Sequence, residues 1–131
     1  MIYQFRIDGE TPSKKNSRIN LPSGVSIPSK KYTEWNKNAI LQLKSELREE
    51  NKLDAPLSSP VSISLLFIHG DKRRRDSDNG CSSIMDTLVD ANILDDDNWN
   101  IVRSIYITND YKKSAPSCAI LIKTLENDTL F

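Results

Sequence analysis

Several common features are scarce or missing in this sequence of 131 residues. It has only two cysteines, Cys81 and Cys118, which are too few and too widely spaced for a disulfide framework or a zinc site of the CxxC type. No apolar run approaches the ~20 residues of a membrane span, and the first residues lack the basic-then-apolar order of a signal peptide. We therefore expect a reduced, cytoplasmic protein with no membrane segment.

Positive charge is absent from residues 76–100, although the whole chain carries 18 basic and 18 acidic side chains. Residues 1–75 hold 14 Lys and Arg against 8 Asp and Glu, residues 76–100 hold 0 against 7, and residues 101–131 hold 4 against 3. Carboxylates crowded in this way repel one another, so we expect a cation among them. Once they are neutralised, the remaining surface is basic, which is typical of proteins that bind nucleic acid.

Hydrophobic periodicity predicts a single α+β domain over residues 1–131, and 37% apolar residues are enough for a buried core. Strands are predicted at residues 2–8, 61–69, 101–108 and 117–123, and helices from Thr33 to about Glu50 and over residues 81–89. Thr33 is the expected N-cap of the first helix, with Glu34 in its first turn. The order β-α-β-α-β-β predicts one mixed or antiparallel sheet with two helices packed on it, and an antiparallel pairing of the last two strands.

Two basic segments are candidates for contacts with DNA phosphates. Residues 9–31, rich in Gly, Pro, Ser and Lys, predict a long irregular loop, for which the alternative is a surface excursion without function. The second segment, residues 72–75, directly precedes the acidic block. It could instead be a solubilising rim or a counter-charge to the aspartates. The candidate DNA-binding side chains are Lys14, Lys15, Arg18, Lys72, Arg73, Arg74 and Arg75.

The acidic block predicts a metal site. Asp76 and Asp78 are two residues apart, so in extended backbone their carboxylates project from one face, and Asp95–Asp97 follow after a predicted helix. We expect the strand after Asp97 to pair beside the strand that ends at His69, which returns the second acidic group to the first. Carboxylate oxygens are ligands for Mg²⁺ or Mn²⁺, and such an ion can activate water for phosphodiester hydrolysis.

Residues 73–102 resemble the RusA family of Holliday-junction resolvases, because RRRDSDN is followed by MDTL in a helix and then by ILDDDNW before a strand. Residues 9–18 are similar to the family's N-terminal loop. The resemblance implies a Mg²⁺-dependent homodimer that nicks opposed strands of a four-way DNA junction in recombination and repair, of phage or bacterial origin. Carried over residue by residue, the metal ligands fall on Asp76, Asp78 and Asp97, and Asp96 is the neighbouring acid of the catalytic group.

The chain departs from the family pattern at two positions. Some members carry a catalytic lysine four residues after the second Asp of DxD, where this chain has Ser82, which cannot supply positive charge. Lys14, Lys15 or one of residues 73–75 could replace it, or turnover could be slow. The family's glycine before the acidic pair is Asn92 here, a milder change because Asn tolerates a left-handed backbone.

Simpler interpretations stand beside these hypotheses. Residues 76–80 could be a polar turn that caps the next helix, and residues 95–97 a solvated loop. Asp86 and Asp90 are expected on a solvated helix face. His69 is expected to be a strand-boundary residue rather than a catalytic base, and the two tryptophans, Trp35 and Trp99, core or interface residues rather than platforms for base stacking.

The same residues bear on three other functions. An EF-hand is excluded, because positions 5, 6 and 12 counted from Asp76 are Gly80, Cys81 and Thr87. A catalytically degenerate protein that binds junctions without cutting them is the main alternative, motivated by Ser82. A DxD phosphatase or phosphotransferase for small esters is disfavoured, because the chain is short for such folds and has no threonine two positions after Asp78.

Overall fold

The computed structural model describes residues 1–49, 53 and 56–125. Its elements are β1 (Ile2–Asp8), β2 (Arg18–Asn20), β3 (Ser26–Pro28), α1 (Lys30–Glu49), β4 (Val61–His69), α2 (Ser77–Asp90), β5 (Val102–Tyr111) and β6 (Ser117–Thr124). The six predicted elements are present in the predicted order, and the α+β class is confirmed. The segment expected to be an irregular loop contains a short hairpin, β2–β3, which the sequence did not reveal.

The main sheet has four strands in the order β1-β6-β4-β5. Strand β6 pairs antiparallel with both β1 and β4, while β4 and β5 pair in parallel, so the sheet is mixed as predicted. The predicted pairing of the last two strands is wrong, because the apolar strand β4 lies between them. The connection from β5 to β6 crosses the end of β4 and donates hydrogen bonds there, from Lys112 N–H to the carbonyl of His69 and from Ser114 N–H to that of Gly70.

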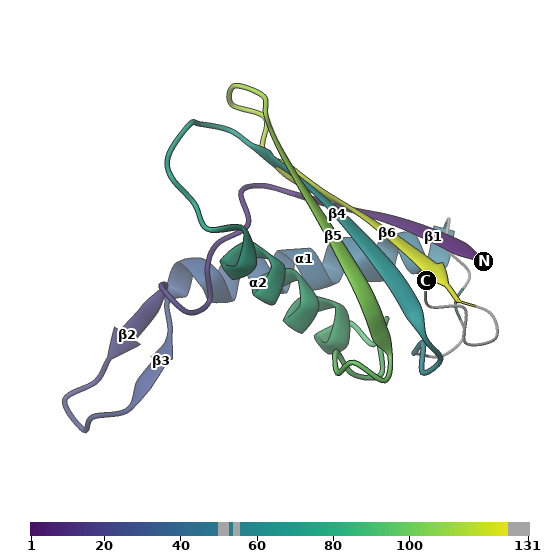
Figure 1. Cartoon of the computed structure of the whole chain (residues 1–131). Helices are drawn as coiled ribbons and strands as arrows, with labels where there is room; N and C mark the ends of the chain where they lie inside the picture. The colour runs from purple at the N-terminus through teal and green to yellow at the C-terminus, as the bar shows by residue number, and fades with distance from the viewer. Residues whose placement is uncertain (50–52, 54–55, 126–131) are drawn as a thin grey trace.

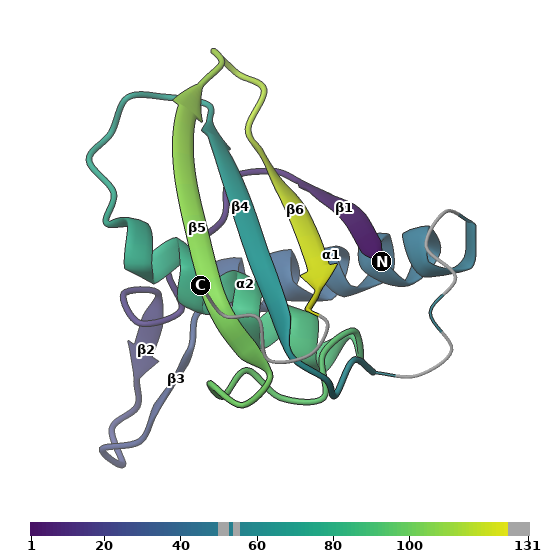
Figure 2. The ribbon, with the colours of Figure 1, turned by 45° about the vertical axis from the view of Figure 1, so that its right-hand side comes forward.

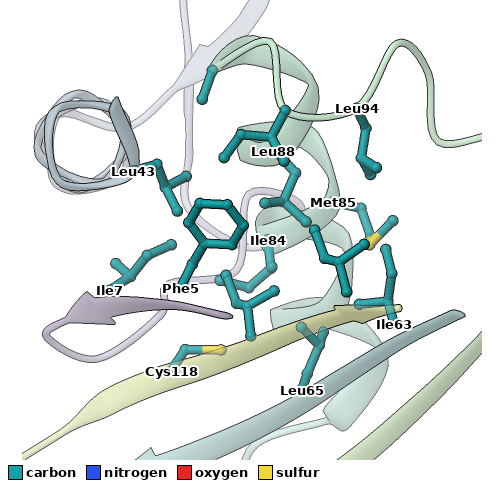
Figure 3. Close-up of a cluster of buried hydrophobic side chains, with 14 of the residues drawn as sticks. Phe5, Ile7, Leu43, Ile63, Leu65, Ile84, Met85, Leu88, Leu94 and Cys118 are labelled. Atoms are coloured by element: carbon teal, nitrogen blue, oxygen red, sulfur yellow. The ribbon is translucent and has the colours of Figure 1, made fainter. Parts of the chain in front are cut away.

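Both helices cover the same face of this sheet, and the hairpin β2–β3 projects away from it (Figures 1 and 2). The core between sheet and helices contains Phe5 and Ile7 from β1, Ile63 and Leu65 from β4, Leu43 from α1, and Ile84, Met85 and Leu88 from α2 (Figure 3). The alternation of buried residues in β1 and β4 follows from the period-2 geometry of strands. This core fixes α2, which carries the candidate site, against the sheet.

Helix α1 begins three residues earlier than predicted. Ser29 is its N-cap, since its Oγ accepts a hydrogen bond from Tyr32 N–H at 3.2 Å, and its carbonyl accepts one from Thr33 N–H at 3.0 Å. The predictions of Thr33 as N-cap and of Glu34 in the first turn are therefore wrong; the first turn holds no acidic residue. The predicted end at Glu50 lies outside the described residues.

Both cysteines are free thiols buried in the core. Burial raises the pKa of the Cys118 thiol to about 12, and burial followed by the charge of Asp78 raises that of Cys81. Thiols held in this neutral form are poor nucleophiles and poor metal ligands. Among the described residues, no helix is both long and apolar enough to cross a membrane.

Candidate metal and nucleic-acid site

Helix α2 begins inside the DxD motif. Asp76 is its N-cap, with an extended backbone (φ −89°, ψ 128°), but its carboxylate makes no capping hydrogen bond. Asp78 lies in the first helical turn, so the expectation that both carboxylates project from one face of extended backbone is wrong. Residues two apart on a helix point to different sides of it. Asp76 and Asp78 accordingly line two different cavities.

The first cavity, here called the Asp78–Asp97 recess, has one residue from each end of the acidic block in its lining. It has a volume of about 310 Å³ and lies between α2 and β5. Its lining consists of Asp78, Cys81, Ser82, Met85, Asp97, Ile105 and Ile107. Strand β5 lies beside β4, as predicted, but the pairing is parallel, so β5 begins beside the start of β4 and not beside its end at His69. The predicted route by which the sheet returns Asp97 to the DxD motif is therefore wrong. Among the described residues that line the recess none is basic, and Ser82 is one of them.

The loop after α2 gives its aspartates different environments. Asp96 accepts hydrogen bonds from Asn98 Nδ2 at 2.9 Å and from Asp97 N–H at 2.7 Å, and these lower its pKa. The pKa of Asp97 is raised, first by burial and then by its neighbours Asp96 and Asp86. The carboxylate of Asp96 therefore organises the loop, while Asp97 is the member of the triplet that lines the recess. Asp95 donates its backbone N–H to the carbonyl of Leu57 and is exposed.

Left-handed backbone at Asn92 (φ 59°) redirects the chain from α2 toward this loop. The next N–H group, that of Ile93, donates to the carbonyl of Leu88, which closes the end of the helix. The prediction that asparagine can replace the family's glycine here is thus confirmed, because it adopts the conformation for which glycine is usually chosen.

The second cavity, here called the strand-end cavity, has a volume of about 440 Å³ and lies on the other side of the start of α2. It collects acidic, basic and polar side chains from the N-terminal segment, the ends of β4 and β5, and the start of α2. They include Glu10, Lys31, His69, Arg73, Arg74, Arg75, Asp76, Ser77 and Asn109.

Glu10 is the centre of the polar contacts in the strand-end cavity. Its Oε2 lies 2.7 Å from His69 Nδ1, and its Oε1 accepts the N–H of Gly70 at 3.1 Å and lies 3.4 Å from a guanidinium nitrogen of Arg75. The other ring nitrogen of His69 lies 2.9 Å from Asn109 Oδ1, and Asn109 Nδ2 donates to Ser77 Oγ at 3.0 Å. This chain of contacts joins the N-terminal segment, β4, β5 and the start of α2.

Sequence reasoning missed the roles of Glu10 and Asn109. Glu10 lies within the segment similar to the family's N-terminal loop, which is the one signal that could have singled it out. His69 stands at the end of β4, as its interpretation as a boundary residue predicts. Trp35 packs against the core, as predicted. Trp99 is 72% exposed, with the Arg103 guanidinium 5.7 Å from its ring centre, so it is not a core residue, and a role at an interface stays a prediction.

Residues 72–75 are partly committed to contacts within the protein. A guanidinium nitrogen of Arg75 lies 2.8 Å from Asp71 Oδ1, and this bond is the main cause that lowers the pKa of Asp71 to about 2. Lys72 lies over the ring of Tyr111 at 5.1 Å. Arg73 and Arg74 line the strand-end cavity with exposed side chains, so they are the members of this group best placed to contact phosphate.

The basic residues near the N-terminus behave differently from one another. Lys14 Nζ lies 3.3 Å from Asp86 Oδ2, and its backbone N–H donates to Ser83 Oγ at 3.1 Å. Asp86 is thus half-buried and paired rather than simply solvated. Lys15 is exposed, while Arg18 binds Ser26 across the hairpin. Lys14 is therefore committed to Asp86, one helical turn after Ser82, and is not among the described residues that line the recess.

The recess is lined by carboxylate oxygens, which are hard and negatively charged ligands and so fit a hard divalent cation. Two exposed carboxylates, Asp78 and Asp97, line the recess, and none of the described residues in its lining is basic. Partial burial, followed by the neighbouring Asp96, raises the pKa of Asp97. Within the described ranges, no three side chains of His, Cys, Asp or Glu are close enough to form a complete set of metal ligands. Asp78 and Asp97 would be at most two protein ligands for an ion such as Mg²⁺, which usually keeps several waters.

Two comparisons with known proteins cover most of the chain. The model of the family described as endodeoxyribonuclease RusA matches residues 8–123, which include strands β2 to β5, both helices and the whole acidic block. A crossover junction endodeoxyribonuclease RusA from Aquifex aeolicus (strain VF5) is 26% identical over 117 residues, covering 88% of this chain and 87% of that protein.

Proposed function

Because the chain belongs to the RusA family of endodeoxyribonucleases, we propose that it is a Mg²⁺-dependent endonuclease that resolves Holliday junctions by hydrolysing phosphodiesters. The observation that carries this proposal is the Asp78–Asp97 recess, where the two ends of the acidic block line one cavity without a basic side chain. The relative from Aquifex aeolicus, named a crossover junction endodeoxyribonuclease, supports branched DNA as the substrate.

In the proposed reaction, Asp78 and Asp97 hold the ion, and Asp76 is the third candidate ligand because its carboxylate makes no capping bond. When bound, Mg²⁺ lowers the pKa of water and neutralises charge on a phosphoryl oxygen. Asp96 keeps the loop in place by accepting the N–H of Asp97. On the other side of α2, Arg73 and Arg74 supply positive charge for the DNA backbone.

A homodimer follows from the proposed substrate. A four-way junction is cut symmetrically on two opposed strands, and a two-fold dimer presents two identical sites to it. Sedimentation of the purified protein should therefore give twice the mass of one 14.9 kDa chain. If the protein is a monomer at the concentrations used for cleavage, the proposal of symmetric cutting is wrong, and the proposal of the metal site is unaffected.

The second candidate is a protein that binds junctions without cutting them. It is favoured by one observation, since Ser82 occupies the position of the family's lysine and nothing basic replaces it in the lining of the recess. Lys14 and Arg75, two of the expected substitutes, are paired with Asp86 and Asp71. Under this alternative the protein retains affinity for junctions, but Mg²⁺ produces no nicks.

The test is cleavage of a synthetic four-way junction by the purified protein with and without Mg²⁺. Cutting that requires the ion, and that is lost in Asp76→Asn while junction binding is unchanged, is the expected result. Binding without cutting would favour the second candidate. Simultaneous loss of binding and cutting in Asp76→Asn would assign Asp76 a folding role, as expected for an N-cap residue.

A further inference from the structure

The hairpin β2–β3 is a built element rather than an irregular excursion. Ile19 pairs with Ile27 and Asn20 with Ser26 across it. The ladder continues to Leu21, whose N–H donates to the carbonyl of Val25 at 2.8 Å. Gly24, at φ 86°, closes the turn by donating to Leu21 at 2.9 Å. A short loop that ends in a left-handed glycine is a common way to join two antiparallel strands.

One face of this hairpin is apolar and exposed. Side chains alternate along a strand and match across an antiparallel pair, so Ile19, Leu21, Val25 and Ile27 share one face. Their exposed fractions are 44%, 38%, 54% and 38%. The hairpin projects away from the sheet and both helices (Figures 1 and 2). These four side chains, here called the hairpin face, therefore do not belong to the core of this chain.

The charge around the hairpin face indicates its partner. Residues 11–33 contain five basic side chains and no acidic one: Lys14, Lys15, Arg18, Lys30 and Lys31. Arg18 lies on the opposite side of the hairpin, where its Nε donates to Ser26 Oγ at 2.7 Å. A partner that accepts both apolar side chains and a concentration of positive charge is a nucleic acid, whose phosphates meet the cations and whose bases meet the apolar side chains.

The base of the hairpin is attached to the helix that carries Asp78. Ser83 on α2 donates from its Oγ to the carbonyl of Pro12 at 2.6 Å and accepts the N–H of Lys14 at 3.1 Å. The two arms of the hairpin are joined at their base, where Ser29 N–H donates to the carbonyl of Ser17 at 2.7 Å. The hairpin is thus connected to α2 through ordered contacts, which set its position relative to the recess.

We propose that the hairpin face inserts against unstacked bases at the branch point of a DNA junction, and so makes the protein select branched over linear DNA. This inference rests on the proposed function and names the element that recognises its substrate. Apolar side chains that enter between base steps must overcome the unstacking of those bases, which costs a few kcal/mol per step in intact duplex. At a branch point stacking is already interrupted, so insertion there is easier than in a linear duplex.

The test uses the double variant Leu21→Ser/Val25→Ser, which removes apolar surface from the end of the hairpin and keeps every charge. Leu41→Ser is the matched control, since Leu41 is 59% exposed on α1. The probe is a four-way junction with 2-aminopurine at the branch point, compared with a linear duplex of the same sequence. Both are titrated without divalent ions, so that cutting does not interfere with binding.

Wild type and Leu41→Ser should raise the fluorescence of 2-aminopurine on binding, because the probe loses its stacking neighbour. The double variant should lose most of this rise and about tenfold of the preference for the junction over the duplex, in line with the worth of one stacking contact. Its affinity for the duplex should stay unchanged. Equal behaviour of variant and wild type, or a parallel loss of duplex affinity, would overturn the proposal.

Two further readouts separate this proposal from others. If sedimentation shows that the double variant loses a dimer that wild type forms, the hairpin face binds a second copy of the chain and the proposal is wrong. If wild type binds junctions with the fluorescence rise but Mg²⁺ gives no nicks, the proposed nuclease fails while the hairpin inference stands. Should the double variant fail to fold, Ile19→Thr/Ile27→Thr applies the same test with β-branched residues kept in the strands.

Discussion

The two sides of helix α2 use similar residues but neutralise charge in different ways. In the strand-end cavity, Glu10 is already matched by His69, Gly70 and Arg75 of the same chain. In the Asp78–Asp97 recess, no basic side chain accompanies the two carboxylates. A carboxylate with partners inside the protein holds structure together, whereas carboxylates without them leave negative charge for an ion from outside. We therefore propose the recess as the metal site because its carboxylates lack basic partners among the described residues that line it, and not because acidic residues are close together.

The largest expected effect is on cleavage, in the recess. Asp78→Asn and Asp97→Asn should each lower the rate of junction cutting, on the order of 100- to 1,000-fold, because each removes a charge that the transition state requires. The measurement is single-turnover cleavage at saturating Mg²⁺. Asp90→Asn is the control, since Asp90 belongs to the same acidic block and is exposed like Asp78 and Asp97, but lines neither cavity. Equal losses in all three variants would contradict a special role of the recess.

Ser82→Lys should increase the cutting rate by up to about 100-fold, because it places positive charge in the recess that lacks it. Asn38→Lys, on an exposed part of α1, adds the same charge elsewhere and should change the rate little. A large gain from almost no wild-type activity would support the degenerate alternative. Rapid cutting by wild type, with no gain in the variant, would dismiss that alternative.

Glu10→Gln tests the strand-end cavity, where the carboxylate has partners within the protein. It leaves the half-buried Arg75, whose side chain is 25% exposed, without one of its two carboxylate partners. We expect a loss of about 1–3 kcal/mol in the free energy of unfolding, measured by urea denaturation. Glu34→Gln, which breaks only an exposed pair with Lys30, should change stability by less than about 0.5 kcal/mol. If both variants are equally stable, the contacts of Glu10 do not hold the strand-end cavity together.

How much of this could be predicted from the sequence depends on the length of each pattern. The long strands and helices have several periods of apolar residues and were placed correctly, whereas the hairpin has two strands of three residues each. That Asp78 and Asp97 line one recess could not be derived from the strand pairing, because β5 pairs in parallel with β4 and so begins at the opposite edge of the sheet from the end of β4. The separation of Asp76 from Asp78 was not predictable either, because it depends on α2 beginning at Ser77 rather than nearer Cys81.

Contacts between residues far apart in the chain could also not be predicted from the sequence. The contacts of Lys14 with Asp86 and of Glu10 with His69 join residues 72 and 59 positions apart, and local periodicity carries no information about them. The order of β4, β5 and β6 in the sheet could not be predicted for the same reason. It depends on which strands pair with the apolar strand β4 and on a connection that crosses the end of that strand.

The smallest expected effect is on stability as a function of pH. A carboxyl whose pKa is raised in the folded state adds stability at low pH, and this is lost as pH rises through the folded pKa. At pH 7 the ionised Asp97 is therefore unfavourable. Asp97→Asn should raise the melting temperature in metal-free buffer by roughly 1–2 °C, since solvent screening limits the effect to a few tenths of a kcal/mol. Mg²⁺ should then stabilise wild type but not the variant. Stabilisation of both by Mg²⁺ would place the ion elsewhere.

The most direct measurement is the location of Mn²⁺ by anomalous diffraction from a crystal soaked in that ion. Our account predicts a peak within ligand distance of both Asp78 and Asp97, about 2.0–2.3 Å from a carboxylate oxygen of each. The same map would show whether Asp76 turns from the strand-end cavity to complete the ligand set. A peak beside Asp95 or Asp96 without Asp78, or no peak at saturating Mn²⁺, would contradict the claim that this recess is the metal site.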